Sequence, residues 1–205
     1  RYPEGMWLPE MAVDQETLTV LADHGIAYTI LSPHQGCLPR SSSEDIPVPG
    51  QGIDTTSPYF CRLPGESEIA IFFHDASIGQ QVAFGDLLEN GDRFADRLIS
   101  ASSEGDLIHF ATDGETFGHH HRFGEMALAW CLDRIDTSAP GTLTVYGEYL
   151  AGHHPEREAE IIGRTSWSCP HGISRWYEEC SCNSGRHEGW SHGWRGPLHT
   201  AIRGL

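Results

Sequence analysis

Lysine is absent from this chain of 205 residues, so all 13 of its basic residues are arginines. Against 29 acidic residues they leave a formal net charge of −16. Nucleic acids and anionic membranes are bound by clustered positive charge, which this composition lacks. The sequence therefore predicts no nucleic-acid partner and no membrane partner, and an uncharged substrate such as a sugar fits the acidic balance better.

Long apolar runs are absent as well. No stretch reaches the roughly 18 consecutive apolar residues of a membrane span, so none is predicted. The length suits one sizeable domain rather than two full ones. The chain starts at Arg1-Tyr2-Pro3 with neither an initiating methionine nor a signal-peptide pattern. We therefore expect a piece of a longer protein.

Six cysteines occur without a signal sequence, which favours buried or free thiols in a reducing compartment and predicts a cytoplasmic location. They are Cys37, Cys61, Cys131, Cys169, Cys180 and Cys182.

Hydrophobic periodicity predicts helices over residues 13–24, 84–100 and 123–132, and strands over 26–31, 68–73, 107–111 and 142–146. Residues 36–67 read as a long loop, and the chain from 161 onward is loop-like. Three predicted strands are followed by polar residues, at His34, at His74-Asp75 and at Asp113. This alternation predicts an α/β fold, a parallel sheet or barrel whose functional residues lie at the carboxyl ends of the strands.

The richest segment is residues 112–121, Thr-Asp-Gly-Glu-Thr-Phe-Gly-His-His-His. A second carboxylate, Glu10, follows Trp7-Leu8-Pro9 far upstream. Two separated carboxylates beside aromatic residues suggest a glycosidase pair, with one as nucleophile and the other as proton donor. Structural roles stay open, because Glu10 is also suited to the first turn of the following helix and Asp113-Gly114 is a common turn dipeptide.

The three consecutive histidines are poorly spaced for one metal ion, so hydrogen bonds from them to substrate hydroxyls are the better interpretation. Glu115 either orients His119 or accepts a hydrogen bond from a sugar, or it is a solvated loop charge. We predict these substrate contacts: Trp7, His34, Asp75, Glu115, Phe117, His119, His120, Trp167 and His171.

The last part of the chain combines Cys169-Pro170-His171 with Cys180-Ser181-Cys182. A small zinc site is one interpretation, although the common Cys-x-x-Cys spacing is missing. Free thiols among packed aromatic residues are the favoured interpretation, and we assign no metal ligand and no cofactor. Tryptophans of this region either stack on sugars or pack in the core.

Trp7-Leu8-Pro9-Glu10, followed by a helix and a strand, resembles the nucleophile region of glycoside hydrolase family 57. Asp113-Gly-Glu-Thr-Phe-Gly-His119 resembles the acid/base motif of that family, and the segment from Trp167 resembles a bacterial subset with an uncharacterised C-terminal extension. The resemblance implies a partial (β/α)7 barrel of the glycoside hydrolase and deacetylase kind. The first strand of the family, with its His-Gln pair, is missing.

By this resemblance, Glu10 is the nucleophile and Asp113 the general acid/base of a retaining enzyme that acts on α-glucans, with Phe117, His119 and His120 at the subsites. We expect residues 1–160 to form part of the barrel and residues 161–205 to pack on its rim. The choice between hydrolysis and glucanotransfer stays open, and so does the oligomeric state. The alternatives are a metal-dependent, deacetylase-like hydrolase and a non-catalytic carbohydrate-binding barrel or module.

Overall fold

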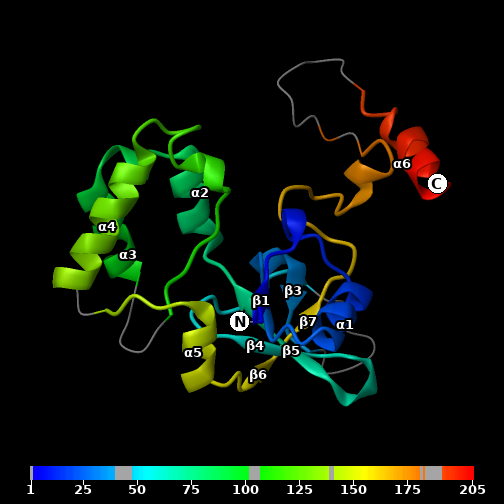
Figure 1. Cartoon of the computed structure of the whole chain (residues 1–205), viewed down its shortest axis with the longest axis horizontal. Helices are drawn as coiled ribbons and strands as arrows, with labels where there is room; N and C mark the ends of the chain where they lie inside the picture. Colours follow the sequence, from blue (N-terminus) through cyan, green and yellow to red (C-terminus); the bar gives the residue numbers. More distant parts are fainter. Residues whose placement is uncertain (1, 40–47, 102–106, 139–140, 181, 183–190) are drawn as a thin grey trace.

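The computed structural model describes residues 2–39, 48–101, 107–138, 141–180, 182 and 191–205. Its centre is a five-stranded sheet with the order β1-β2-β5-β4-β6 (Figure 1). The strands are β1 (Gly5–Met6), β2 (Tyr28–Leu31), β4 (Tyr59–Arg62), β5 (Glu68–Phe73) and β6 (Arg157–Glu158). Because β1, β2 and β5 are parallel, their carboxyl ends meet at one edge. β4 runs antiparallel to β5 and parallel to β6.

The core of the sheet forms because β2 and β5 are apolar on both faces, as central parallel strands are. Ile71, Phe72 and Phe73 of β5 are fully buried. Helix α1 (Gln15–Asp23) covers one face with Leu18 and Leu21. It starts at Asp14, whose carboxylate accepts a hydrogen bond from the Thr17 N–H at 2.8 Å.

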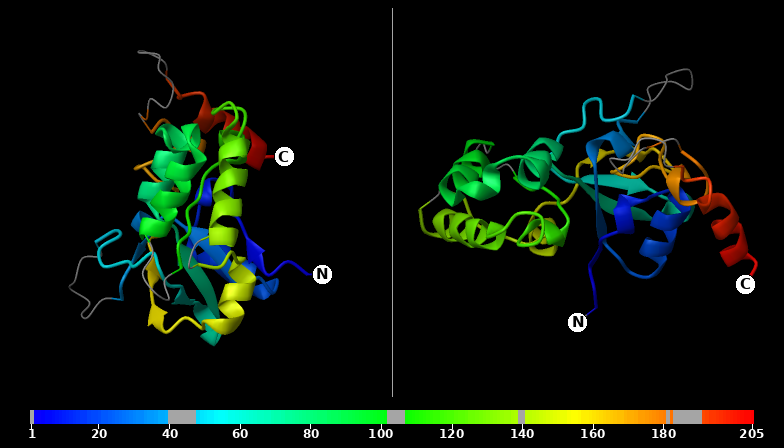
Figure 2. Two further views of the ribbon diagram at one scale, coloured as in Figure 1. Left: turned by 90° about the vertical axis from the view of Figure 1, so that its left-hand side faces the viewer. Right: turned by 90° about the horizontal axis from the view of Figure 1, so that it is seen from above.

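Helices α2 (Ala76–Phe84), α3 (Gly91–Ala101) and α4 (Gly124–Ser138) form a separate layer with its own apolar core (Figures 1 and 2). Helix α5 (Tyr146–Gly152) packs instead against the core of the sheet. A two-stranded ribbon joins β3 (Gly36–Cys37) to β7 (Glu160–Ile161), and α6 (Arg195–Arg203) lies near the C-terminus. None of the helices in the described part of the chain combines the length and apolarity that a membrane crossing needs.

The α/β class is confirmed, and so are the helices at 13–24 and 123–132 and the strands at 26–31 and 68–73. The helix predicted over 84–100 is divided: α2 ends at Phe84 and α3 begins at Gly91. Asn90 causes the restart, because its side chain accepts hydrogen bonds from the N–H groups of Asp92 and Arg93.

Two predicted strands are wrong. Residues 107–111 form no ladder, since the segment is attached by single bonds, from Leu107 N–H to Thr56 and from Asp75 N–H to the His109 carbonyl. Residues 142–145 lead into α5 without pairing.

The predicted loop at 36–67 contains β3 and β4, and the predicted loop-like end contains β7 and α6. The division between residues 160 and 161 stays a prediction. It falls inside β7, which pairs with β3.

Candidate active site

A cleft of about 450 Å³ opens where the chain leaves the carboxyl ends of β1, β2 and β5. Its other wall is helix α2 together with residues 111–113. The parallel strands thus bring together polar residues that are far apart in sequence, as α/β folds do at this edge. The polar and aromatic lining residues are Glu10, Ser32, His34, His74, Gln80, Phe84, Thr112, Asp113, Trp167, Ser168 and Arg175.

Glu10 lies on a tightly held turn, Pro9–Met11, just beyond β1. Its backbone has a φ of 57° and that of Met11 a φ of 48°, the left-handed region that residues with a side chain rarely adopt. Such conformations cost about 1–3 kcal/mol each and persist where the surroundings enforce them. Here the Trp167 N–H donates to the Glu10 carbonyl at 3.1 Å, and the buried Gln35 amide donates to the Met11 carbonyl at 2.7 Å.

The Glu10 carboxylate is also oriented by a neighbour. The Ser168 hydroxyl donates to its Oε2, and the Arg175 guanidinium donates to the Ser168 Oγ at 2.8 Å. This chain of donors holds the carboxylate in one orientation, as the aim of a nucleophile requires.

Asp113 begins the short turn Gly114–Thr116, yet its side chain does not cap that turn. Its pKa is raised, first by partial burial and next by the negative charges of Glu10 and Glu115, while His120 acts in the opposite direction. A carboxyl beside a second carboxylate holds its proton to higher pH, which is the property of a general acid. The effect of the Glu10 charge on the Asp113 pKa shows that the two carboxyls interact electrostatically across the cleft.

Two histidines line the cleft beyond the ends of β2 and β5. The His34 ring bonds to the Ser32 hydroxyl at 2.9 Å and to the Ser166 carbonyl at 3.0 Å, so both of its nitrogens are engaged. Within the described residues neither ring nitrogen of the buried His74 has a hydrogen-bond partner. Burial lowers the His74 pKa, which leaves a neutral ring able to donate one hydrogen bond and accept another.

Trp167 forms an aromatic wall of the cleft. Its ring meets that of Trp7 edge to face, with centroids 5.4 Å apart, and that of His74 at 6.1 Å. Trp7 itself is 41% exposed and lies behind Trp167 rather than in the cleft lining.

The structure therefore gathers Glu10, His34, Asp113 and Trp167 of the predicted site, with Trp7 next to them. Asp75 instead caps α2, accepting from the Ile78 N–H at 2.9 Å. Phe117 packs against the helical core, and Glu115, His119 and His120 are exposed on the turn after Asp113. His171 lies in the Cys-rich segment. These residues are outside the cleft lining, and their roles stay predictions.

Sequence reasoning missed His74, Ser168 and Arg175 as site residues. His74 could have been found, since it comes just after a predicted strand, even closer to the strand end than His34. Ser168 and Arg175 come from a loop whose path no pattern in the sequence indicates.

A second hollow, of about 370 Å³, lies between α3, α4 and α5 and is lined mostly by apolar residues such as Leu98, Leu132 and Val145. None of the predicted site residues lines it. Without a carboxylate among its lining residues it has no acid–base chemistry of the kind found in the first cleft.

Comparison with known proteins decides the family, because the model of glycosyl hydrolase family 57 matches residues 1–162. The chain belongs to glycosyl hydrolase family 57. An α-amylase from Pyrococcus horikoshii is 25% identical over 176 residues, which are 81% of this chain and 26% of the amylase.

Solved structures show the same fold. A 4-α-glucanotransferase from Thermococcus litoralis matches with a TM-score of 0.65 and 20% identity, over 87% of this chain and 26% of the transferase. An exo-type maltose-forming amylase from a Pyrococcus species matches with a TM-score of 0.72 and 12% identity, over 98% of this chain and 37% of the amylase. The predicted partial barrel of family 57 is thereby confirmed, and the chain spans between a quarter and two fifths of the length of these relatives.

Proposed function

We propose that this chain carries the catalytic carboxylates of a retaining glycoside hydrolase or glucanotransferase acting on α-glucans. The observation that supports this most is that Glu10 and Asp113 line one cleft and that the charge of Glu10 raises the pKa of Asp113. Family membership and the α-amylase and 4-α-glucanotransferase among the relatives point to the same substrate class.

In this mechanism a carboxylate oxygen of Glu10 attacks the anomeric carbon while Asp113 gives its proton to the departing glycosidic oxygen. The product is a glycosyl ester of Glu10. Asp113, now ionised, takes a proton from water or from a sugar hydroxyl, and the oxygen of that group displaces Glu10 from the anomeric carbon. Two inversions at one carbon retain its configuration.

The other cleft residues have supporting roles in this proposal. The neutral His74 ring, whose two nitrogens have no partner among the described residues, is placed to bind a sugar hydroxyl. Trp167 offers an aromatic face, the usual platform for a sugar ring. Trp7 supports Trp167 from behind.

Glu10→Gln tests the nucleophile in the full-length protein. We expect kcat on a glucan to fall by about a thousandfold or more, with glucan binding and the unfolding temperature largely kept. Turnover above about a tenth of the wild-type value would rule out a covalent role.

Trapping gives a test that does not depend on a loss of activity. A 5-fluoro-α-glucosyl fluoride should leave one fluoroglucosyl group on the peptide that contains Glu10, detected by mass spectrometry. Glu10→Gln is the control and should show no adduct. A metal-dependent, deacetylase-like hydrolase would form no such ester, and a non-catalytic barrel would bind glucan without turnover or labelling.

Azide separates the two roles. With an activated aryl α-glucoside, Glu10→Ala plus azide should give a glycosyl azide of inverted configuration, since azide replaces the nucleophile. Asp113→Ala plus azide should give the retained product, because Glu10 still acts first. If Glu10→Ala gave the retained azide and Asp113→Ala the inverted one, Asp113 would be the nucleophile and Glu10 the acid/base.

The proposal keeps the prediction of no nucleic-acid or membrane partner. A cytoplasmic location is part of it and is supported by the cysteines of the described residues, among which no disulfide forms.

A further inference from the structure

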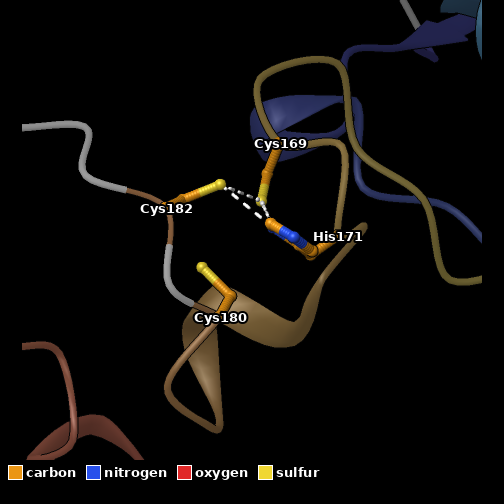
Figure 3. Close-up of side chains that lie close together, drawn as sticks. All are labelled: Cys169, His171, Cys180 and Cys182. Carbon is orange, nitrogen blue, oxygen red and sulfur yellow. Dashed lines mark hydrogen bonds between the residues drawn. The ribbon is translucent and has the colours of Figure 1, made fainter.

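Four side chains that bind soft metals gather in the loop beyond the cleft (Figure 3). They are Cys169, His171, Cys180 and Cys182, and their ligand atoms all lie within 4.8 Å of one another. The His171 Nδ1 is 3.1 Å from the Cys182 Sγ and 3.9 Å from the Cys169 Sγ, and the two sulfurs are 3.4 Å apart. Figure 3 shows all four pointing toward a common centre.

These separations suit one tetrahedral zinc ion. Bonds of about 2.3 Å to sulfur and about 2.0 Å to nitrogen place neighbouring ligand atoms about 3.5–3.8 Å apart. Three cysteines and one histidine are a common ligand set of structural zinc sites, in which no coordination position is left for water. Cys169 and Cys180 are buried, Cys182 is half-buried and His171 is exposed, so the cluster lies at the edge of the loop with its sulfurs turned inward.

The loop itself builds half of the site. A tight turn joins Cys169 to Gly172, whose N–H donates to the Cys169 carbonyl at 3.0 Å. Gly172 has a φ of +67°, and a side chain there would collide with the Arg164 carbonyl. The turn therefore places Cys169 and His171 on the same side, and the chain returns after the short helix Ser174–Trp176 to supply Cys180 and Cys182.

A disulfide between Cys169 and Cys182 is the competing explanation for the short distance between their sulfurs. It would use two of the four groups and would leave no reason for Cys180 and His171 to meet at the same point. Four soft ligands from two separate segments are accounted for by a metal.

We propose that Cys169, His171, Cys180 and Cys182 bind one Zn²⁺ ion as a structural site. The ion joins Cys169 and His171 to Cys180 and Cys182 and so fixes the loop that starts at Trp167. That loop carries Ser168 and Arg175, the donors that orient Glu10. The positioning of Glu10 by this loop rests on the proposed function, whereas zinc binding does not.

Metal analysis of the purified protein is the direct test. Protein produced with zinc in the medium and dialysed should hold about one equivalent of zinc per chain by plasma mass spectrometry. Cys182→Ser and His171→Ala should each hold less than about a tenth of an equivalent. Cys37→Ser is the matched control, since a hydroxyl can donate to the Glu160 carbonyl as the thiol does, and it should keep its zinc.

Cobalt provides a readout in the intact wild-type chain. Zinc-free protein titrated with Co²⁺ should develop the visible bands of a tetrahedral ion and a sulfur-to-cobalt charge-transfer band. Cys180→Ser should lower that charge-transfer band by about one third, because one of three thiolates is lost. Octahedral spectra, or a wild-type mass showing a disulfide between Cys169 and Cys182 with no bound zinc, would overturn the proposal.

Glu10→Gln separates this proposal from the enzymatic one. The variant leaves all four ligands in place and should carry full zinc whether or not the enzyme is a glycosidase. Zinc binding with unchanged turnover in Glu10→Gln would reject only the catalytic assignment. A zinc-free wild-type protein that loses turnover on Glu10→Gln would reject only the metal site.

Discussion

Glu10 and Asp113 reach the same cleft on supports of different rigidity. Glu10 is held through its own carbonyl, through its carboxylate and through the buried Gln35 beneath Met11, in a backbone conformation that is otherwise unfavourable. Asp113 lies on an exposed turn without a cap bond from its side chain. The difference matches the two chemical tasks, because a nucleophile must be aimed at one carbon whereas an acid/base must exchange its proton with solvent.

The firmest support is expected to be Gln35, so its loss should have the largest effect. Gln35→Leu leaves the Met11 carbonyl and the Ser32 N–H without the bonds they make to the amide at 2.7 and 3.0 Å. We expect the free energy of unfolding to fall by about 4 kcal/mol, measured by urea denaturation.

Thr116→Val in the Asp113 turn is the matched control. It removes one neutral hydrogen bond, at 2.8 Å to Thr112, and should cost about 1 kcal/mol. An equal decrease in the free energy of unfolding in the two variants would contradict the idea that Glu10 is held more rigidly than Asp113.

The segment before Asp113 is anchored in a pH-dependent way. Burial lowers the pKa of His109 to about 4, and its ring bonds to the Thr55 carbonyl and to the Tyr146 hydroxyl, each at 3.0 Å. The unfolded chain binds a proton near pH 6.5 and the folded chain only near pH 4, so stability is fully present above 6.5 and is lost as the pH falls through this window. The total loss should approach about 3 kcal/mol.

Urea unfolding of the wild type and of His109→Gln at pH 7 and pH 4.5 checks this. The glutamine can make both hydrogen bonds but does not titrate, so its stability should fall less on acidification. If the wild type and His109→Gln lose the same free energy of unfolding on acidification, the acid sensitivity belongs to groups other than His109.

The smallest effect concerns the electrostatic link between the two carboxyls. Glu10→Gln removes a charge that raises the pKa of Asp113, so that pKa should fall, as followed by carboxyl-carbon NMR. Glu115→Gln should lower it as well, but less, because the influence of Glu115 is smaller. A larger decrease from Glu115→Gln would place the electrostatic partner of Asp113 outside the cleft.

Much of the central sheet could be predicted, because the hydrophobic pattern of each strand lies within a short stretch of sequence. The apolar runs of β2 and β5 and the polar residues after them indicate both the strands and the edge where Glu10 and His34 meet. β4 is short and follows a segment rich in proline and glycine, so its pairing with β5 is decided by tertiary contacts. Residues 107–111 show the reverse, since an apolar run finds no neighbouring strand to pair with.

The remainder of the site depends on contacts between distant residues. Ser168 meets Glu10 across 158 positions of sequence, and the His34 ring meets the Ser166 carbonyl across 132. No local pattern encodes such pairs. The spacing from Cys169 to Cys182 is likewise ambiguous until the loop is seen to return on itself.

The bridge between Val13 and Thr165 has a consequence for the order of folding. During synthesis Gln35, whose amide bonds to the Met11 carbonyl, follows the Glu10 turn after 24 positions, whereas Thr165 and Trp167 follow only after more than 150. The distant part of this support is therefore added after the local part, since contacts of such long sequence separation form last. A nascent chain halted before Thr165 would hold the Glu10 carboxylate and the Gln35 bond but would lack the contacts from Thr165, Trp167 and Ser168.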